Sequence, residues 1–355
     1  MRIGTPRETK TLEGRVALVP AAAGDLVRRG HEVWLEHDAG VKSGFADAEY
    51  TQLGVHIAPD AAALYAKGEL IVKVKEPIAG DLALLRKDHL LFCYLHLAAE
   101  PKLTRQLLDI GLTGVAFETV ELENGDLPLL APMSIIAGKI AVQVGTHLLH
   151  QPMGGKGVLL GGLPSTKRGK VVVFGAGAAG GNSAALAASG GANVVVFEKR
   201  ADRMEEMMRL GNNVTALYPY EEVVAREIAT ADLVVGAVLV TGAKAPHVLS
   251  RAMLKGMEPG SVVVDISVDQ GGCFETTRPT TWKEPTYVEE GVIHFAVTNM
   301  PGAVPQTSSQ AICAAILPWV NKLASGDWRG SKPLSRGINI EAGKIVHPAL
   351  LDMKV

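Results

Sequence analysis

Short runs of β-branched residues alternate with Ala- and Leu-rich stretches along most of this chain, and each gap between two runs can hold a helix. This alternation is typical of an α/β fold in which helices join parallel strands that are buried on both faces. The predicted strands form an early group, 32–36, 70–74 and 90–94, and a later group, 171–174, 194–197, 233–236 and 261–265. The sequence therefore predicts two Rossmann-like domains, each with a parallel sheet.

Two breaks separate these groups. A predicted helix at 135–150 leads into the later strands, and the segment 300–305 ends them because it contains two prolines and a glycine. A helix at 307–323, kinked by Pro318, follows this hinge. The remaining tail is too short for its own core, so we expect it to pack onto the first group. We therefore expect a discontinuous domain of residues 1–130 and 306–355 around a central domain of residues 131–305.

Composition excludes several classes of partner. The 355 residues include 35 basic and 37 acidic side chains, so a formal charge of -2 attracts neither nucleic acid nor an anionic membrane surface. The first residues lack the apolar stretch of a signal peptide, and the apolar runs are strand-sized. Cys93, Cys273 and Cys313 are isolated, which favours reduced thiols, a cytoplasmic location and no metal site. A small-molecule partner fits best.

A glycine-rich turn in the later group carries the most specific local signal. Gly175, Gly177 and Gly180 form a GxGxxG motif that follows a predicted strand and opens a helix. Glu198 lies at the end of the next strand, 18 positions beyond Gly180 (198 − 180), where a carboxylate can bind ribose hydroxyls. This context predicts an NAD site at a helix N-terminus. Lys199 and Arg200 leave a second possibility open, because adjacent cations can bind the 2′-phosphate of NADP.

Four polar side chains stand in apolar surroundings at expected strand ends or turns. Lys75 follows an early strand, His96 closes another, and Arg15 follows a polar turn at 11–14. Asp269 lies just beyond the strand 261–265, where ligands of α/β folds bind, whereas Asp265 lies within that strand and is interpreted as structural. Three of the four also have a plain interpretation: Lys75 as a solvated lysine, His96 as a core histidine and Arg15 as a surface arginine.

Six separated segments together resemble the alanine dehydrogenase family, which is similar to the NAD-binding subunit of transhydrogenase. They are 1–18, 72–77, 95–98, 130–134, 269–273 and 298–302. The resemblance implies NAD-dependent oxidative deamination of L-alanine to pyruvate and ammonia, and the reverse reductive amination. It also implies a homohexamer, a substrate domain made from the two chain ends and an NAD-binding domain between them.

The same resemblance implies roles for individual residues. His96 and Asp269 are the expected catalytic residues, with His96 as the proton shuttle; Arg15, Lys75, Met133 and Asn299 are expected to bind substrate. The expected cofactor-binding residues are Ser134, Gly175, Gly177, Ala178, Ala179, Gly180, Glu198, Arg203, Val238, Leu239, Ile266, Asp269, Val297, Asn299 and Met300.

Two departures from the family pattern bear on these roles. The family usually carries a glutamate after Met133 and Ser134, where this chain has Ile135, and its ribose-binding carboxylate is usually aspartate, where this chain has Glu198. A related amino-acid or opine-type dehydrogenase with a different substrate is therefore an alternative. A non-catalytic NAD-binding module is a second one.

Overall fold

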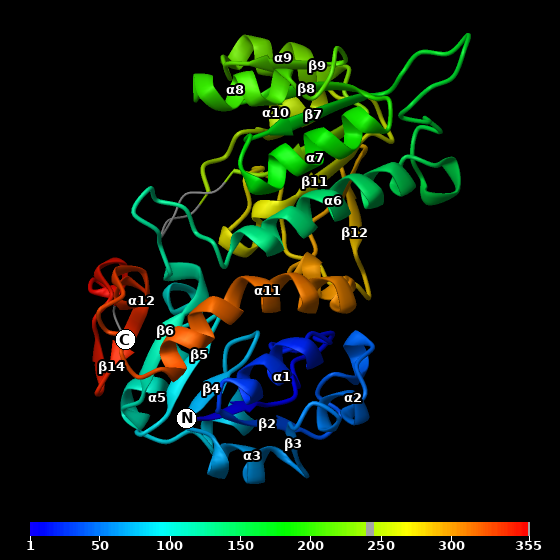
Figure 1. The fold of residues 1–355 in the computed structure, drawn as a ribbon. Coiled ribbons are helices and arrows are strands. Elements are labelled where there is room, and N and C mark those ends of the chain that lie inside the picture. The colour runs from blue at the N-terminus through cyan, green and yellow to red at the C-terminus, as the bar shows by residue number, and fades with distance from the viewer. Residues whose placement is uncertain (239–244, 354–355) are drawn as a thin grey trace. The chain divides into compact units, whose positions relative to one another are not determined.

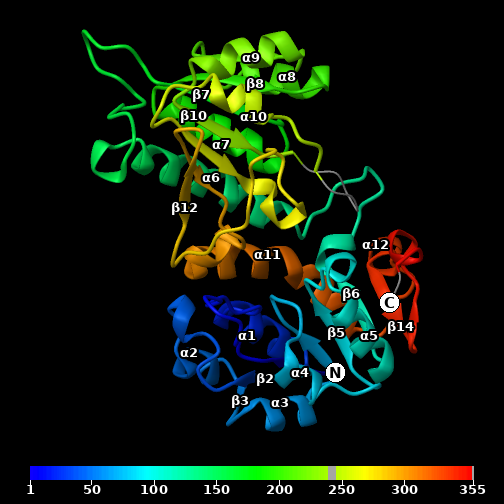
Figure 2. The same ribbon diagram turned by 180° about the vertical axis from the view of Figure 1, so that it is seen from behind.

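A computed structural model describes residues 1–238 and 245–353, which divide into two compact units (Figure 1). Unit 1 comprises Met1–Met133 and Gly302–Val355, and unit 2 comprises Ser134–Pro301. Both ends of the chain therefore belong to unit 1, as Figure 2 also shows.

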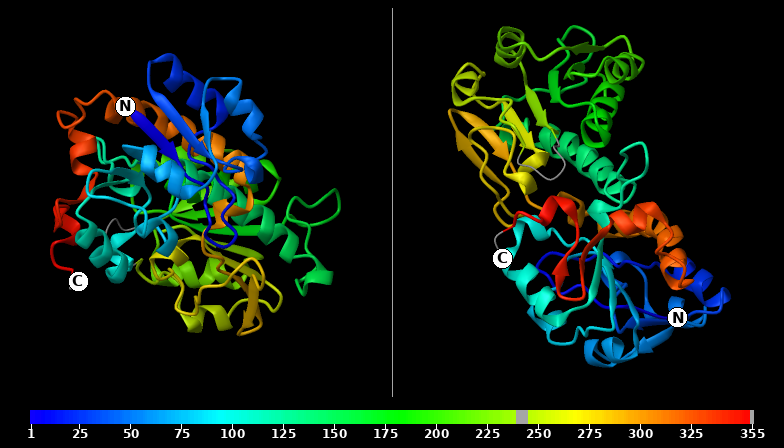
Figure 3. Two further views of the ribbon diagram at one scale, coloured as in Figure 1. Left: turned by 90° about the horizontal axis from the view of Figure 1, so that it is seen from below. Right: turned by 90° about the vertical axis from the view of Figure 1, so that its left-hand side faces the viewer.

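Unit 1 is built on a sheet that has, in the described part of the chain, eight strands in the order β15-β14-β6-β5-β4-β1-β2-β3. The strands β1 to β6 pair in parallel, whereas β14 pairs antiparallel with both β6 and β15. The C-terminal tail thus supplies one edge of the sheet (Figure 3). The strands are β1 (Arg2–Thr5), β2 (Glu32–Glu36), β3 (His56–Ala58), β4 (Leu70–Val72), β5 (Leu90–Cys93), β6 (Thr113–Ala116), β14 (Ile338–Glu341) and β15 (Lys344–Ile345).

The helices of unit 1 bury apolar faces on this sheet. The long helix α11 (Pro305–Ala324) buries Ile312, Ile316, Val320 and Leu323, which recur at helical spacing, and it contains Pro318. The other helices are α1 (Pro20–Arg28), α2 (Asp47–Thr51), α3 (Ala61–Lys67), α4 (Ala79–Leu82), α5 (Pro101–Ile110) and α12 (Lys332–Arg336). Proline at the start of α1, α5, α11 and α12 suits a position whose N–H needs no helical acceptor.

Unit 2 holds a second sheet, which in the described residues has seven strands in the order β12-β13-β11-β10-β7-β8-β9. All its pairs are parallel except that of β12 with β13. The strands are β7 (Lys170–Phe174), β8 (Asn193–Phe197), β9 (Val214–Leu217), β10 (Leu233–Gly236), β11 (Val262–Asp265), β12 (Thr286–Glu289) and β13 (Val292–Phe295). The helices are α6 (Ala131–Leu148), α7 (Ala178–Ser189), α8 (Ala201–Met208), α9 (Glu221–Ala229) and α10 (Arg251–Lys255).

Glycines allow two helices of unit 2 to pack closely. A Cβ built on Gly138 of α6 would lie 2.1 Å from the carbonyl oxygen of Ala179, and one built on Gly145 would lie 2.5 Å from Leu233 of β10. Helix α6 therefore lies directly against both α7 and the sheet, as Figures 1 and 2 show.

The predicted α/β class with two sheets is confirmed, and the sheets are mostly rather than wholly parallel, because β12, β14 and β15 pair antiparallel. The strand expected at 70–74 ends at Val72, although the N–H of Lys73 still donates to Phe92 and that of Tyr94 to Val74. The helix that the glycine motif was expected to open begins at Ala178, within the motif. No helix in the described ranges combines the length and the apolar character that crossing a membrane requires.

Candidate active site

The glycine-rich turn of unit 2 joins β7 to α7 as the motif predicts. Gly175 has a φ of 90°, which favours glycine, and its N–H donates to the carbonyl of Phe197 at 2.8 Å. A Cβ on Gly180 would lie 1.8 Å from the carbonyl oxygen of Gly175, so this position requires glycine for the helix to approach the strand. A Cβ on Gly177 would meet only the Arg203 guanidinium, at 3.3 Å, within the described residues.

These contacts leave a cradle at the start of α7. The first turn of a helix presents N–H groups that have no acceptor within the helix, and the helix dipole adds positive potential there. Because Gly177 places no side chain over this turn, an anion can reach the N–H groups of Ala178, Ala179 and Gly180. The turn fits the pyrophosphate of a dinucleotide.

Glu198 lies directly after β8, beside this turn. Its carboxylate accepts hydrogen bonds from the backbone N–H groups of Ala176 at 2.9 Å, Lys199 at 2.7 Å and Arg200 at 3.1 Å. Partial burial opposes the charge, but these hydrogen bonds and Arg203 outweigh it and lower the pKa of Glu198. Because a carboxylate oxygen accepts more than one hydrogen bond, this fixed anion can also receive ribose hydroxyls.

Whether this site can bind the 2′-phosphate of NADP depends on the two cations that follow Glu198. The Arg200 guanidinium forms a hydrogen-bonded ion pair with Asp202, two residues further on. Lys199 is exposed. The geometry beside the turn therefore presents a held carboxylate and an already paired arginine, which favours NAD over NADP.

Asp265 ends β11 and organises the loop that carries Asp269. Its buried carboxylate accepts from the N–H groups of Ser267 and Cys273, both at 2.8 Å, and from the Thr277 hydroxyl at 2.5 Å. This pattern agrees with a structural interpretation of Asp265. Asp269 lies in the 3₁₀ helix η5 (Ile266–Gln270) and is exposed.

The structure also places the other proposed cofactor residues. Within unit 2, Ser134, Val238, Ile266 and Asn299 are half-buried, whereas Val297 and Met300 are buried. Leu239 lies outside the described residues. Asn299 has a φ of 57°, a strained value for a non-glycine residue, and it precedes the 3₁₀ helix η6 (Met300–Ala303).

Arg15 of unit 1 is only 2% exposed, so its interpretation as a surface arginine is wrong. Its Nε donates to a carboxylate oxygen of Glu13 at 2.6 Å, its Nη2 donates to the other oxygen, and its Nη1 lies 3.2 Å from the sulfur of Met133. Burial opposes the charge, but Glu13 outweighs it and raises the pKa of Arg15. The guanidinium is thus fixed in place and permanently charged.

His96 and Lys75 follow β5 and β4 respectively. The interpretation of His96 as a core histidine is wrong because it is only half-buried, and its φ of 51° is strained. Its backbone N–H donates to Glu118 at 2.6 Å, and its ring stacks on Tyr94 with centroids 5.7 Å apart. The Lys75 side chain is 13% exposed, so it is not a solvated lysine, and its Nζ lies 4.0 Å from a carboxylate oxygen of Glu76.

Tyr94 connects two of these candidates, and sequence reasoning missed it. Its ring stacks on His96, and its hydroxyl, which donates to the carbonyl of Leu129 at 2.6 Å, interacts electrostatically with Arg15. Glu13 and Glu118 were missed as well. The signal available was weak: Glu13 is an acidic residue two positions before a candidate arginine, and Tyr94 is a polar aromatic residue next to a predicted strand end.

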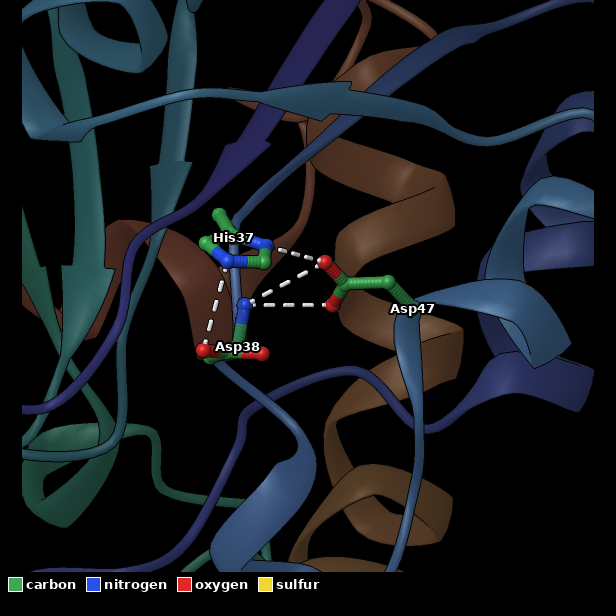
Figure 4. Close-up of side chains that lie close together, drawn as sticks. All are labelled: His37, Asp38 and Asp47. Carbon is green, nitrogen blue, oxygen red and sulfur yellow. Dashed lines mark hydrogen bonds and ion pairs between the residues drawn. The ribbon is translucent and has the colours of Figure 1, made fainter.

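A further polar group lies on the surface of unit 1 (Figure 4). His37, Asp38 and Asp47 have ligand atoms within 4.8 Å of one another. The Nδ1 atom of His37 lies 2.6 Å from Asp47 and its Nε2 atom 3.3 Å from Asp38, so both ring nitrogens face carboxylates. The hydrogen bond to Asp47, followed by the charge of Asp38, raises the pKa of His37. A histidine whose two ring nitrogens face carboxylates accounts for this group.

The glycine turn, the helix start and the carboxylate of unit 2 define a dinucleotide-binding α/β protein, and unit 1 adds a buried arginine, a lysine and a histidine. The family model for the alanine dehydrogenase/PNT N-terminal domain matches residues 4–137, and that for the C-terminal domain matches residues 141–348. The chain belongs to the alanine dehydrogenase/PNT family.

Individual relatives agree with this assignment. The chain is 45% identical to the alanine dehydrogenase of Halomonas elongata, over 99% of this chain and 96% of that protein, and 44% identical to that of Mycobacterium tuberculosis, over 98% and 95%. A solved L-alanine dehydrogenase superposes with a TM-score of 0.95 at 46% identity, covering 99% of this chain and 98% of that one. A transhydrogenase from Sinorhizobium meliloti gives 0.85 at 25% identity, covering 98% and 100%.

Proposed function

We propose that this chain is an NAD-dependent amino-acid dehydrogenase that converts L-alanine, water and NAD to pyruvate, ammonia and NADH, and that also catalyses the reverse reaction. The observation that carries the proposal is the match to alanine dehydrogenases over 98–99% of the chain. It is supported by a complete dinucleotide turn in unit 2 and a fixed buried cation in unit 1.

Unit 1 is the proposed substrate domain. The guanidinium of Arg15, held by Glu13, binds the carboxylate of the amino acid through charge-assisted hydrogen bonds. Lys75 binds the carbonyl oxygen of the 2-oxo acid. Met133, which contacts Arg15, and Asn299 are the other proposed substrate-binding residues. Holding the carboxylate and the carbonyl oxygen of a three-carbon acid orients its α-carbon for reaction.

Unit 2 is the proposed NAD domain. The N–H groups of Ala178, Ala179 and Gly180 bind the pyrophosphate, and Glu198 and Arg203 bind the adenosine ribose. Ser134, Val238, Leu239, Ile266, Asp269, Val297, Asn299 and Met300 complete the proposed cofactor site. NAD bound there would supply the acceptor for the hydride that leaves the substrate α-carbon.

His96 moves the proton in the proposed reaction. The amino acid reacts as its neutral amine: loss of hydride from the α-carbon leaves an iminium, and the imidazole of His96 accepts a proton from the water that attacks this iminium. His96 returns this proton to the amino nitrogen of the resulting carbinolamine and accepts the hydroxyl proton, so that the C–N bond breaks, ammonia leaves and the carbonyl of pyruvate forms. Asp269 balances the positive charge of the ammonium and the carbinolamine. In the reverse direction the same groups return the proton.

The test is a spectrophotometric assay with a panel of L-amino acids and either NAD or NADP. We expect turnover with alanine and NAD, and loss of most of it, about 100-fold or more, in His96→Ala and Lys75→Ala, because proton transfer and orientation each contribute on that scale. The control is Lys102→Ala, which removes an exposed lysine from α5 of the same unit. Intact turnover in both site variants would refute the assigned roles.

A second candidate function is an NAD-binding module that does not oxidise an amino acid. The chain superposes on a transhydrogenase with a TM-score of 0.85, and this likeness favours the alternative. The glycine turn of this chain alone would suffice for such a module. The same assay separates the two, since such a module binds NAD without reducing it in the presence of any amino acid. A related dehydrogenase with a different amino-acid substrate would instead be revealed by the panel.

We also propose that six copies assemble and that the enzyme works in the cytoplasm. The hexamer is the assembly that the family resemblance implies. The three cysteines are buried free thiols, which suits a reducing compartment. Light scattering coupled to size-exclusion chromatography tests the assembly: a mass of six chains of 37.4 kDa supports it, and a monomer mass contradicts it.

A further inference from the structure

A chain of buried charges lies behind Lys75, and the proposed reaction does not use it. Lys73 is 1% exposed, and its Nζ lies 3.4 Å from carboxylate oxygens of both Glu8 and Asp81, which are themselves buried. Burying charges is costly unless each one is paired, so this arrangement must serve the fold or the site.

Glu8 connects these charges to the backbone of the proposed substrate site. It lies in the loop after β1, and one of its oxygens, Oε1, accepts hydrogen bonds from the N–H of Val74 at 2.7 Å and from the N–H of Lys75 at 3.1 Å. Its other oxygen, Oε2, faces the Lys73 ammonium. One carboxylate therefore accepts from two consecutive peptide N–H groups just beyond the end of β4, and the carbonyl of Val74 accepts from the N–H of Tyr94 on the other side.

Asp81, the second carboxylate beside Lys73, is also held in place by hydrogen bonds. Asp81, in α4, accepts the Tyr65 hydroxyl at 2.7 Å and the N–H of Ile78 at 3.0 Å. Lys73 consequently lies between two carboxylates whose positions are set by other elements. Burial raises the pKa of Glu8 and Lys73 opposes that change, so the lysine favours the charged form that accepts both hydrogen bonds.

We propose that Glu8 and Lys73 are positioning residues for Lys75: the Lys73 ammonium holds the Glu8 carboxylate, and Glu8 fixes the peptide groups that direct the Lys75 side chain at the 2-oxo acid. This inference rests on the proposed function for its kinetic consequence, but the arrangement of Lys75 can be measured without turnover.

The experiment compares the wild-type enzyme with Glu8→Ala, Glu8→Gln, Lys73→Met and the control Glu69→Ala. Glu69 accepts a hydrogen bond from the Arg2 N–H at 2.9 Å and forms an ion pair with the Arg2 guanidinium. Glu69 therefore links β1 and β4 at their N-terminal ends, whereas Glu8 links the same two strands beyond their C-terminal ends. The readouts are KM for pyruvate, kcat, the dissociation constant of NADH, and acetylation of Lys75 by an N-hydroxysuccinimide ester, measured on its peptide relative to Lys102.

We expect Glu8→Ala to raise KM for pyruvate about tenfold or more, with a smaller change in kcat, because a small misplacement of an orienting group is costly. NADH binding should not change, and Lys75 should be acetylated several-fold faster. Glu8→Gln, which keeps an acceptor oxygen, and Lys73→Met should show smaller changes in the same direction. Glu69→Ala should match the wild type in all four readouts.

A folded Glu8→Ala variant with the KM and acetylation rate of Glu69→Ala would overturn the inference. If Glu8→Ala does not fold, unchanged values in both Glu8→Gln and Lys73→Met would overturn it. A wild-type enzyme that turns over neither alanine nor pyruvate would refute the proposed function instead. In that case the acetylation rates alone decide whether Glu8 positions Lys75.

Discussion

Adding one methyl group at two positions of the glycine turn should give opposite results. A Cβ at Gly180 would lie 1.8 Å from the carbonyl oxygen of Gly175 and 2.9 Å from its carbonyl carbon, both backbone atoms. A Cβ at Gly177 would meet only the end of the Arg203 side chain, at 3.3 Å, among the described residues. Gly180→Ala therefore tests the packing of α7, and Gly177→Ala tests the approach of a phosphate.

The expected magnitudes follow from these contacts. Overpacking costs about 1–3 kcal/mol, and backbone cannot yield as a side chain does, so we expect the upper end for Gly180→Ala. A loss of about 3 kcal/mol corresponds to a fall in Tm of roughly 6–12 °C for a domain of this size. Gly177→Ala should change stability by no more than about 0.5 kcal/mol. It should weaken NAD binding roughly tenfold or more, because hydrogen bonds to a charged phosphate are worth about 1.5–3 kcal/mol.

Differential scanning fluorimetry and a fluorescence titration with NADH measure both effects. Gly181→Ala is the matched control: its added Cβ lies on the same helix and meets the flexible end of Met207 at 3.3 Å. We expect it to retain stability and NADH affinity. Normal Tm in Gly180→Ala, or normal affinity in Gly177→Ala, would refute the assignment of this turn.

Three further predictions follow from the hydrogen bonds of single carboxylates. Asp265→Asn should lower the free energy of unfolding by about 2–3 kcal/mol, because an amide cannot accept all the donors that converge there, and an unchanged denaturation midpoint would contradict this. The raised pKa of His37 means that its ion pairs stabilise the fold below pH 6.5, its ordinary pKa, and that this stability is lost as the pH rises through the folded pKa. NMR titration should show a lower His37 pKa in Asp47→Asn, and an identical titration would show that Asp47 is not the cause. Glu198→Ser should raise the ratio of kcat/KM for NADP to that for NAD about tenfold, as a carboxylate no longer repels the 2′-phosphate, and an unchanged ratio would exclude Glu198 from cofactor selection.

The fold could be predicted well where strands are buried on both faces. Strands β7, β8 and β10 are short runs of mostly apolar residues rich in valine, as expected where both faces of a sheet are covered, and they were predicted within a residue. Short strands such as β3 and β9 were missed because only three or four residues with mixed polarity form them. Pairing with neighbouring strands, rather than local preference, stabilises these segments.

The residues of the candidate site also divide into those that the sequence predicts and those that it does not. The glycine turn and Glu198 are local in sequence, so their spacing revealed them. The burial of Arg15 could not be predicted, because part of its environment, such as Met133, lies 118 residues away in the sequence. Glu8 was missed for the same reason, since it acts on a segment 66 residues away. Contacts between loops of different strands leave no periodic signal in the sequence.

Direct transfer of hydrogen between alanine and the cofactor is the measurement that tests the central proposal most sharply. L-alanine deuterated at the α-carbon is incubated with NAD and the enzyme, and the product NADH is examined by proton NMR. We predict that deuterium occupies carbon 4 of the nicotinamide, on one face of the ring. NADH without deuterium, or no NADH at all, would contradict the proposal that this enzyme oxidises alanine by hydride transfer.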